Sequence, residues 1–249
     1  MRDIKAIIFD LGDTLIYFDA VLENVLVEAD EVLYQSLVEK GLHLEKAPFL
    51  EEFRTRMNAY FQERDSEFIE HTTFYVLGEV LKDLSFSELP EELLRTALRK
   101  MYTVFENYWI PEAESISVLK ELQRRGYRLG LVSNASDDED VQTLIDKAGI
   151  RSYFDRIITS AAAGIRKPNP FIFQPLFQAW NLRPEQVAMV GDTLGADILG
   201  ARNAGMFGIW ITRRAENAGN RAHQDAIRPD AAVANISELP ALFDELSQR

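Results

Sequence analysis

Short apolar runs recur along the chain, and amphipathic segments of helical length separate most of them. The runs predict buried strands at residues 4–9, 128–132, 155–159, 187–190, 207–211 and 231–233. The segments between the later runs predict helices at 114–125, 137–148, 170–180 and 195–204. In the first of these helices, Ile116, Leu119 and Leu122 share one face. This alternation predicts an α/β fold, a Rossmann-like parallel sheet core with right-handed crossovers and helices on both faces.

Residues 17–111 interrupt the alternation. They contain no convincing strand, and their apolar positions recur with the three- and four-residue spacing of helices. We predict helices near 20–40, 47–63, 66–83 and 89–108, the first ending at Gly41. The chain thus divides into an α/β core, residues 1–16 and 112–249, and an inserted all-helical unit, residues 17–111. The polar segment 213–229 predicts a loop.

Composition restricts the classes of partner. The formal net charge of −13 argues against a nucleic-acid-binding face and against docking on anionic membranes. No apolar run reaches the ~18 residues of a transmembrane helix, and the N-terminus has no signal-peptide core. The chain has no cysteine, which excludes disulfides and thiolate chemistry and suits a cytoplasmic protein. His43, His71 and His223 are scattered and predict ordinary surface or core positions.

Polar residues follow three of the predicted strands. Asp10 ends the first strand, Ser133 and Asn134 follow the second, and Asp192 follows the fourth. The carboxyl ends of parallel strands form one edge of the sheet, so these side chains should lie close together. A carboxylate can attack phosphorus when a cation neutralises the phosphate, and a Ser hydroxyl with backbone N–H groups can cradle that phosphate. The structural alternatives are strand-end turns and helix caps.

Four segments in a fixed order carry a resemblance to a known family. They are IKAIIFDLGDTL (4–15), LVSNAS (131–136), RKPNP (166–170) and MVGDTLGADILGA (189–201). Together they resemble the haloacid dehalogenase-like (HAD) hydrolase superfamily, in its phosphoglycolate phosphatase-like branch with a helical cap after the first motif. The resemblance covers nearly the whole chain. It implies a HAD-like core, a mobile helical cap over the active site, and Mg²⁺-dependent hydrolysis of a phosphomonoester.

The resemblance also implies a metal site. Asp10 would be both the nucleophile and a Mg²⁺ ligand, and Gly12 would add its backbone carbonyl. Asp192 would bind the ion directly, and Asp197 directly or through water. A site with few carboxylates leaves room for water and phosphate, as Mg²⁺ prefers. The structural alternative for Asp197 is a carboxylate at a helix N-terminus.

Four further residues would act on the substrate by the same resemblance. Lys167 would bridge nucleophile and phosphate, a role for which Arg166 is the weaker candidate. Ser133 would bind the transferring phosphoryl group, with Asn134 beside it. Thr14 would stabilise the tight turn after the nucleophile, at the substrate side of the site. Taken alone, Lys167 is better interpreted as an exposed lysine on a loop, and only the resemblance favours the catalytic role.

The chain departs from the family pattern at Gly12. Phosphatases of the family carry there a second Asp that protonates the leaving oxygen and then activates water, whereas this chain has its acid one place later, at Asp13. Three outcomes remain open: Asp13 substitutes, turnover is slow, or the activity differs. The 2-haloacid dehalogenases also lack the second Asp, but they need no Mg²⁺ and lack the pair Asp192 and Asp197, which therefore favours phosphoryl chemistry. The other alternative is a nearly inactive protein that binds a phosphate ligand.

The expected substrate is a small soluble phosphomonoester enclosed by the cap. Candidate specificity residues are Tyr17, Phe18, Arg54, Arg56 and Tyr60. The sequence leaves open whether the protein is a monomer or a homodimer.

Overall fold

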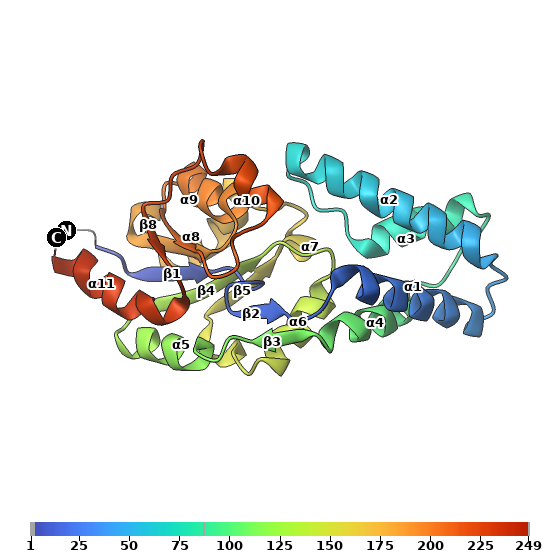
Figure 1. The fold of residues 1–249 in the computed structure, drawn as a ribbon, viewed down its shortest axis with the longest axis horizontal. Coiled ribbons are helices and arrows are strands. Elements are labelled where there is room, and N and C mark those ends of the chain that lie inside the picture. Colours follow the sequence, from blue (N-terminus) through green and yellow to red (C-terminus); the bar gives the residue numbers. More distant parts are fainter. Residues whose placement is uncertain (1–2, 87, 249) are drawn as a thin grey trace.

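A six-stranded sheet forms one end of the molecule (Figure 1). The computed structural model describes residues 3–86 and 88–248. All neighbouring strands in the sheet are parallel, in the order β5-β4-β1-β6-β7-β8. The strands are β1 (Ala6–Phe9), β4 (Arg128–Ser133), β5 (Arg156–Thr159), β6 (Val187–Gly191), β7 (Phe207–Ile211) and β8 (Ala231–Val233). The predicted α/β fold is confirmed, and each strand lies within two residues of its predicted bounds.

Helices cover both faces of the sheet. On one face lie α5 (Ser115–Arg124), α6 (Asp138–Lys147) and α11 (Leu239–Gln248), and on the other α8 (Gln174–Trp180) and α9 (Leu199–Ala204). Alternate residues of β1 point to opposite faces. Ile7 and Phe9 pack in the cluster with α5 and α6, whereas Ala6 and Ile8 pack in the cluster with α8. Both faces of β1 are therefore buried, which explains its unbroken apolar run.

Four long helices form the other end of the molecule. They are α1 (Leu22–Glu39), α2 (Lys46–Glu67), α3 (Thr73–Asp83) and α4 (Glu91–Glu106). Their apolar faces build a separate cluster in which Leu33, Leu77 and Leu98 meet. As predicted, α1 ends just before Gly41, whose φ of 92° favours glycine. The division into a core at 1–16 and 112–249 and a cap at 17–111 stays a prediction.

A short antiparallel ribbon connects the two ends. It pairs β2 (Ile16–Phe18) with β3 (Trp109–Pro111), and Phe18 lies opposite Trp109. The prediction of no strand within 17–111 is therefore wrong at both limits of that segment. Three-residue strands are too short to show a period, and their partners are some ninety residues apart in the chain.

Helix boundaries differ from the prediction near residue 66. Helix α2 continues to Glu67 and ends at Phe68, which adopts a left-handed φ of 56°. Helix α3 begins only at Thr73, where Thr72 caps it by accepting a hydrogen bond from the Tyr75 backbone. Residues 68–72 are thus an extended connection and not the start of a helix. A six-residue helix was also missed in the predicted 213–229 loop, α10 (Ala218–His223), which Asn217 caps.

The remaining helical segments are short. Predicted helix 170–180 begins as a 3₁₀ turn at Pro170–Phe173, and predicted helix 195–204 begins as a π turn at Leu194–Ile198. Helix α7 covers Ser160–Ala163. Within the described residues, none of the helices combines the length and the apolar character needed to cross a bilayer.

Candidate active site

The carboxyl edge of the sheet gathers the polar residues predicted from the strand ends. Asp10 follows β1, whose neighbours are β4 and β6, and the Asp10 N–H donates to the Val190 carbonyl at 2.9 Å. Ser133 is the last residue of β4, and Asp192 follows the last residue of β6. All three are nearly buried and line one cavity. This is the crevice at which open α/β sheets bind ligands.

Lys167 lies at the centre of the site with its side chain buried. Its Nζ donates to Asp10 Oδ1 at 2.5 Å, to Asp197 Oδ1 at 2.7 Å and to the Val132 carbonyl at 2.7 Å. Three acceptors satisfy the three N–H groups of the ammonium. Because buried charges are tolerated when they are paired and hydrogen-bonded, Lys167 is held rigidly between the two carboxylates.

Asp197 occupies a pocket that only glycine at residue 191 leaves open. Its Oδ2 accepts a hydrogen bond from the Thr193 backbone at 2.9 Å. A Cβ on Gly191 would lie 2.2 Å from that same oxygen. One carboxylate oxygen each from Asp10, Asp192 and Asp197 lies within 4.8 Å of the others. This spacing and the all-oxygen donor set fit a hard divalent cation such as Mg²⁺.

Burial and crowding of negative charge dominate the electrostatics. Burial raises the pKa of Asp192 to about 9, and the Asp197 and Asp10 carboxylates add to the shift. Burial also raises the pKa of Asp10 to about 6, against the opposing charge of Lys167. Burial lowers the pKa of Lys167, but the Asp10 and Asp197 carboxylates outweigh it and leave that pKa above its ordinary value. One ammonium faces three carboxylates, so a further cation at this position would relieve the repulsion.

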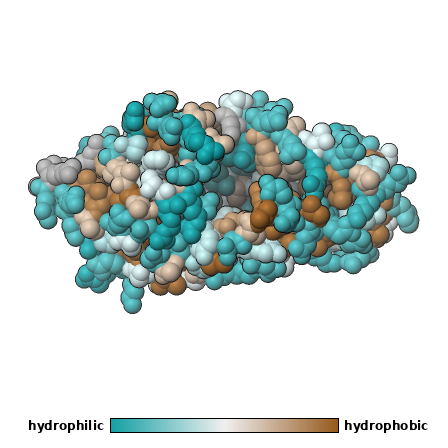
Figure 2. All heavy atoms as spheres, viewed as in Figure 1, coloured by the Kyte–Doolittle hydropathy of each residue, from teal (hydrophilic) through white to brown (hydrophobic). Residues whose placement is uncertain are grey.

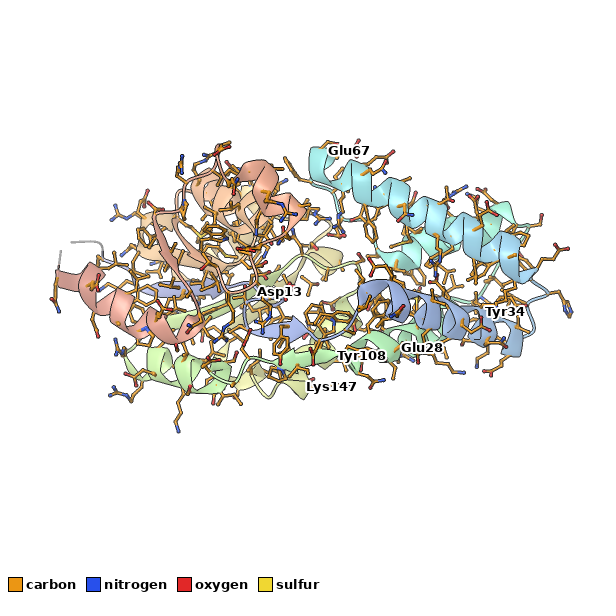
Figure 3. All side chains as sticks on the ribbon, viewed as in Figure 1. Asp13, Glu28, Tyr34, Glu67, Tyr108 and Lys147 are labelled. Carbon is orange, nitrogen blue, oxygen red and sulfur yellow. The ribbon has the colours of Figure 1, made fainter. Side chains whose placement is uncertain are left out.

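The turn after β1 brings Asp13 to the same cavity (Figure 3). Asp13 adopts a left-handed φ of 53°, a conformation that Asp tolerates better than most residues. Burial raises the pKa of the Asp13 carboxyl, and the Arg214 guanidinium opposes the shift. Gly12 also lines the cavity, and a Cβ there would lie 3.3 Å from Trp109 Cη2. The indole therefore occupies the space into which a side chain at residue 12 would begin to extend.

A family model for haloacid dehalogenase-like hydrolases matches residues 4–205. The chain belongs to this family. The prediction of a hydrolase with a HAD-like fold is thereby confirmed. The hydrolase is 30% identical over 241 residues to a glyceraldehyde 3-phosphate phosphatase of Methanothermobacter thermautotrophicus, covering 96% of this chain and all of that protein.

Two solved structures extend the comparison. A HAD phosphatase from Thermococcus onnurineus has a TM-score of 0.63 and 25% identity, over 96% of this chain and 98% of its own. A 2-haloacid dehalogenase from Pseudomonas syringae pv. tomato has a TM-score of 0.67 and 24% identity, over 98% and 99%. The second likeness shows the fold alone, and the fold is common to both activities.

The phosphate-binding residues predicted for this hydrolase occupy different positions. Ser133 and Asn134 line the cavity. Asn134 Nδ2 donates to the Lys167 carbonyl at 2.9 Å, and its Oδ1 accepts from the Lys167 N–H at 2.8 Å, so its amide fixes the loop that carries the lysine. Thr14 is buried and is not among the described residues that line the cavity, and its Oγ1 has no hydrogen-bond partner within the described residues. The predicted turn-stabilising hydroxyl bond is therefore not seen.

The helices α1, α2 and α4 close the other side of the cavity, which has a volume of about 950 Å³. Of the five specificity residues predicted for the hydrolase, Arg54 lines this cavity. The other four (Tyr17, Phe18, Arg56 and Tyr60) are not among the lining residues of the described chain. Tyr60 is instead buried, and its hydroxyl donates to Glu70.

Several residues that shape the site were missed in the sequence. Asn220 of α10 donates from Nδ2 to the Asp192 carbonyl at 2.9 Å and accepts at Oδ1 from the Leu194 N–H at 2.7 Å. Trp210 Nε1 donates to the same Asp192 carbonyl at 2.7 Å. These contacts fix the loop that carries two of the carboxylates. The only sequence signal for Asn220 was its place in a polar stretch, which predicted a loop.

Proposed function

We propose that this hydrolase is a Mg²⁺-dependent phosphatase that cleaves a small phosphomonoester through an aspartyl-phosphate on Asp10. The observation that carries the proposal is the convergence of Asp10, Asp192 and Asp197 around the buried Lys167 ammonium. A carboxylate nucleophile, a fixed cation and a cluster of hard oxygen donors are the parts that phosphoryl transfer needs. The phosphatase names of the relatives at comparable length support the same reaction.

In this proposal each side chain has a distinct role. An Asp10 oxygen attacks phosphorus and the bond to the leaving alcohol breaks, which gives an aspartyl-phosphate. Lys167 holds the attacking carboxylate at 2.5 Å and places positive charge beside the phosphate. The Ser133 hydroxyl at the end of β4 binds a phosphate oxygen, and Asn134 keeps Lys167 in position. Water then attacks phosphorus, which releases phosphate and restores Asp10.

Asp10, Asp192 and Asp197 would hold Mg²⁺, with the Gly12 carbonyl as a further ligand. When bound, the ion would neutralise charge on the phosphate and on the carboxylates. The raised pKa values of Asp10 and Asp192 support this assignment, because the protein alone leaves the cluster short of positive charge.

Asp13 is the proposed acid and base. Asp13 lines the cavity, and burial raises the pKa of its carboxyl against the opposing effects of the Arg214 guanidinium and the Phe18 backbone N–H. A raised pKa favours the protonated form that a leaving alcohol requires. Asp13→Asn should lower kcat by about 10²–10⁴-fold. An unchanged kcat would remove Asp13 from the mechanism.

The first experiment measures phosphate release from a panel of phosphomonoesters, with Mg²⁺ or with EDTA. We expect turnover only with Mg²⁺, loss of turnover in Asp10→Asn, and no change in Asp83→Asn, a matched substitution at the exposed end of α3. Turnover that survives Asp10→Asn, or none at all from folded protein, would overturn the phosphatase.

The second candidate is a 2-haloacid dehalogenase. The indole of Trp109 beside Gly12 favours it, because it places an apolar wall near Asp10 where phosphatases of the family carry a second Asp. Halide release from a 2-haloacid in EDTA would support this candidate and exclude the first.

Location in the cytoplasm and a monomeric or dimeric state stay predictions.

A further inference from the structure

The cavity continues far beyond the carboxylates. It opens between α1, α2 and α4 and has a volume of about 950 Å³. Figure 2 shows the hollow between the two ends of the molecule, with hydrophobic spheres along its edge over the start of α1. A phosphate group and a three-carbon alcohol would fill only a small part of this volume. The rest of the cavity therefore has room for a larger leaving group.

One face of α2 forms a wall of the cavity. Phe53, Met57, Phe61 and Phe68 line the cavity at helical spacing. With a rise of 1.5 Å per residue, this row is about 22 Å long. Phe68 lies at the catalytic end, because its carbonyl accepts a hydrogen bond from the Arg166 N–H next to Lys167. The apolar row thus leads from the reacting centre outward along the cleft.

Helix α1 supplies an apolar wall that faces solvent. Leu22 and Leu26 line the cavity one helical turn apart, with 50% and 37% of their surface exposed. Met101 and Phe105 of α4 line the same space. Clustered apolar side chains in an open cleft are typical of ligand-binding grooves, because a bound group removes them from water.

Three charged groups of α1 and α2 line the cavity, namely Asp30, Arg54 and Arg64, and the Arg64 guanidinium lies over the Phe61 ring at 4.5 Å. Arg54 lines the cavity, and its guanidinium pairs with Asp30, which lines the cavity as well. The pair cancels its own charge, so a bisphosphate or dicarboxylate would gain little there. An uncharged group leaves the pair intact.

We propose that the substrate is a phosphomonoester of an alcohol with an extended, uncharged and largely apolar group, which lies between α1 and α2. This inference rests on the proposed phosphatase function. A short polar phosphate is a poorer fit for this cavity, because it would leave the apolar row of α2 exposed to water.

A chain-length series tests the proposal. Ethyl, butyl and hexyl phosphate have leaving alcohols of nearly equal acidity, so differences in kcat/KM report contacts of the chain. A fully enclosed methylene contributes about fourfold. Since part of the groove faces solvent, we expect about 2.4-fold per methylene and on the order of thirtyfold from ethyl to hexyl. Sorbitol 6-phosphate, with the same carbon count as hexyl phosphate, should react at least about tenfold more slowly.

Two substitutions in α1 test whether the alkyl chain binds against this helix. Leu26→Asp places a charge in the wall and should lower the hexyl-to-ethyl ratio of kcat/KM by about tenfold. Val27→Asp changes an equally apolar, exposed residue outside the lining and should keep that ratio. An unchanged ratio in Leu26→Asp, or a flat chain-length series, would overturn the groove assignment.

The outcomes separate this inference from the phosphatase itself. Mg²⁺-dependent hydrolysis with no increase in kcat/KM from ethyl to hexyl phosphate would refute the apolar substrate and leave the proposed phosphatase function intact. If none of the esters reacts, calorimetry with ethyl- and hexylphosphonate measures binding affinity and so tests the groove assignment without turnover. Hexylphosphonate that binds no more tightly than ethylphosphonate overturns the inference, and tighter binding that Leu26→Asp removes supports it.

Discussion

Replacing Asp192 with asparagine should stabilise the metal-free protein at neutral and alkaline pH. Burial raises the pKa of Asp192 to about 9, whereas an aspartate in an unfolded chain titrates near 4. Between these values the folded protein keeps a proton that the unfolded chain releases, so the Asp192 contribution to stability falls as pH rises. The slope is about 1.4 kcal/mol per pH unit, or about 4 kcal/mol between pH 5 and pH 8. Because asparagine does not titrate, the variant does not lose this unfolding free energy as the pH rises.

The assay is urea unfolding of wild type and Asp192→Asn in EDTA at pH 5, 6, 7 and 8. The difference in unfolding free energy, variant minus wild type, should grow by about 4 kcal/mol across this range, equivalent to about 10 °C in melting temperature for a chain of this size. Taking the difference cancels the titration of distant groups. On the proposed metal site, Mg²⁺ should stabilise the wild type and not the variant at pH 8. A difference independent of pH would show that Asp192 is ionised throughout and would refute the reasoning.

Three further predictions follow from other contacts. Asp140→Asn should also gain stability as pH rises from 5 to 8, because burial raises the Asp140 pKa to about 8, but Mg²⁺ should not alter this gain as it does for Asp192. Glu70→Gln should lower the unfolding free energy in urea by about 2 kcal/mol, because the buried carboxylate accepts hydrogen bonds from two hydroxyl groups. Gly12→Ala should cost about 1 kcal/mol in the same assay by crowding the indole of Trp109, and Trp109→Leu should remove that cost in a double-mutant cycle.

The sheet and its carboxyl edge were predictable because one physical pattern governs them. A strand buried on both faces reads as a continuous apolar run, so β1 and β6 were visible without any partner. Once the strands were placed, parallel topology required Asp10, Ser133 and Asp192 to share an edge. The proximity of Lys167, which lies outside any strand, came instead from the resemblance of its motif.

Other parts of the site were hidden because they depend on contacts between distant segments. Neither β2 nor β3 has a period of its own, and each is a strand only because the other lies beside it. Asn220 lies in a polar stretch whose short helix is held by contacts with the Asp192 loop. Glu70 is a charged residue in a helical region by pattern, yet it is almost fully buried against the sheet end of the molecule.

The connection around Glu70 gives the helices a second attachment to the core, besides the β2–β3 ribbon. Ile69 forms a bridge with Ile165, and the Glu70 N–H donates to the Gly164 carbonyl at 3.1 Å. The Glu70 carboxylate accepts from Ser160 Oγ at 2.6 Å. The loop that contacts Ile69 and Glu70 continues directly into Lys167. The same stretch of backbone therefore supports both the helices and the Lys167 ammonium. A movement that lifts α2 from the sheet would break the Ile69–Ile165 bridge and remove one support of the loop that carries Lys167, which the Asn134 amide also holds.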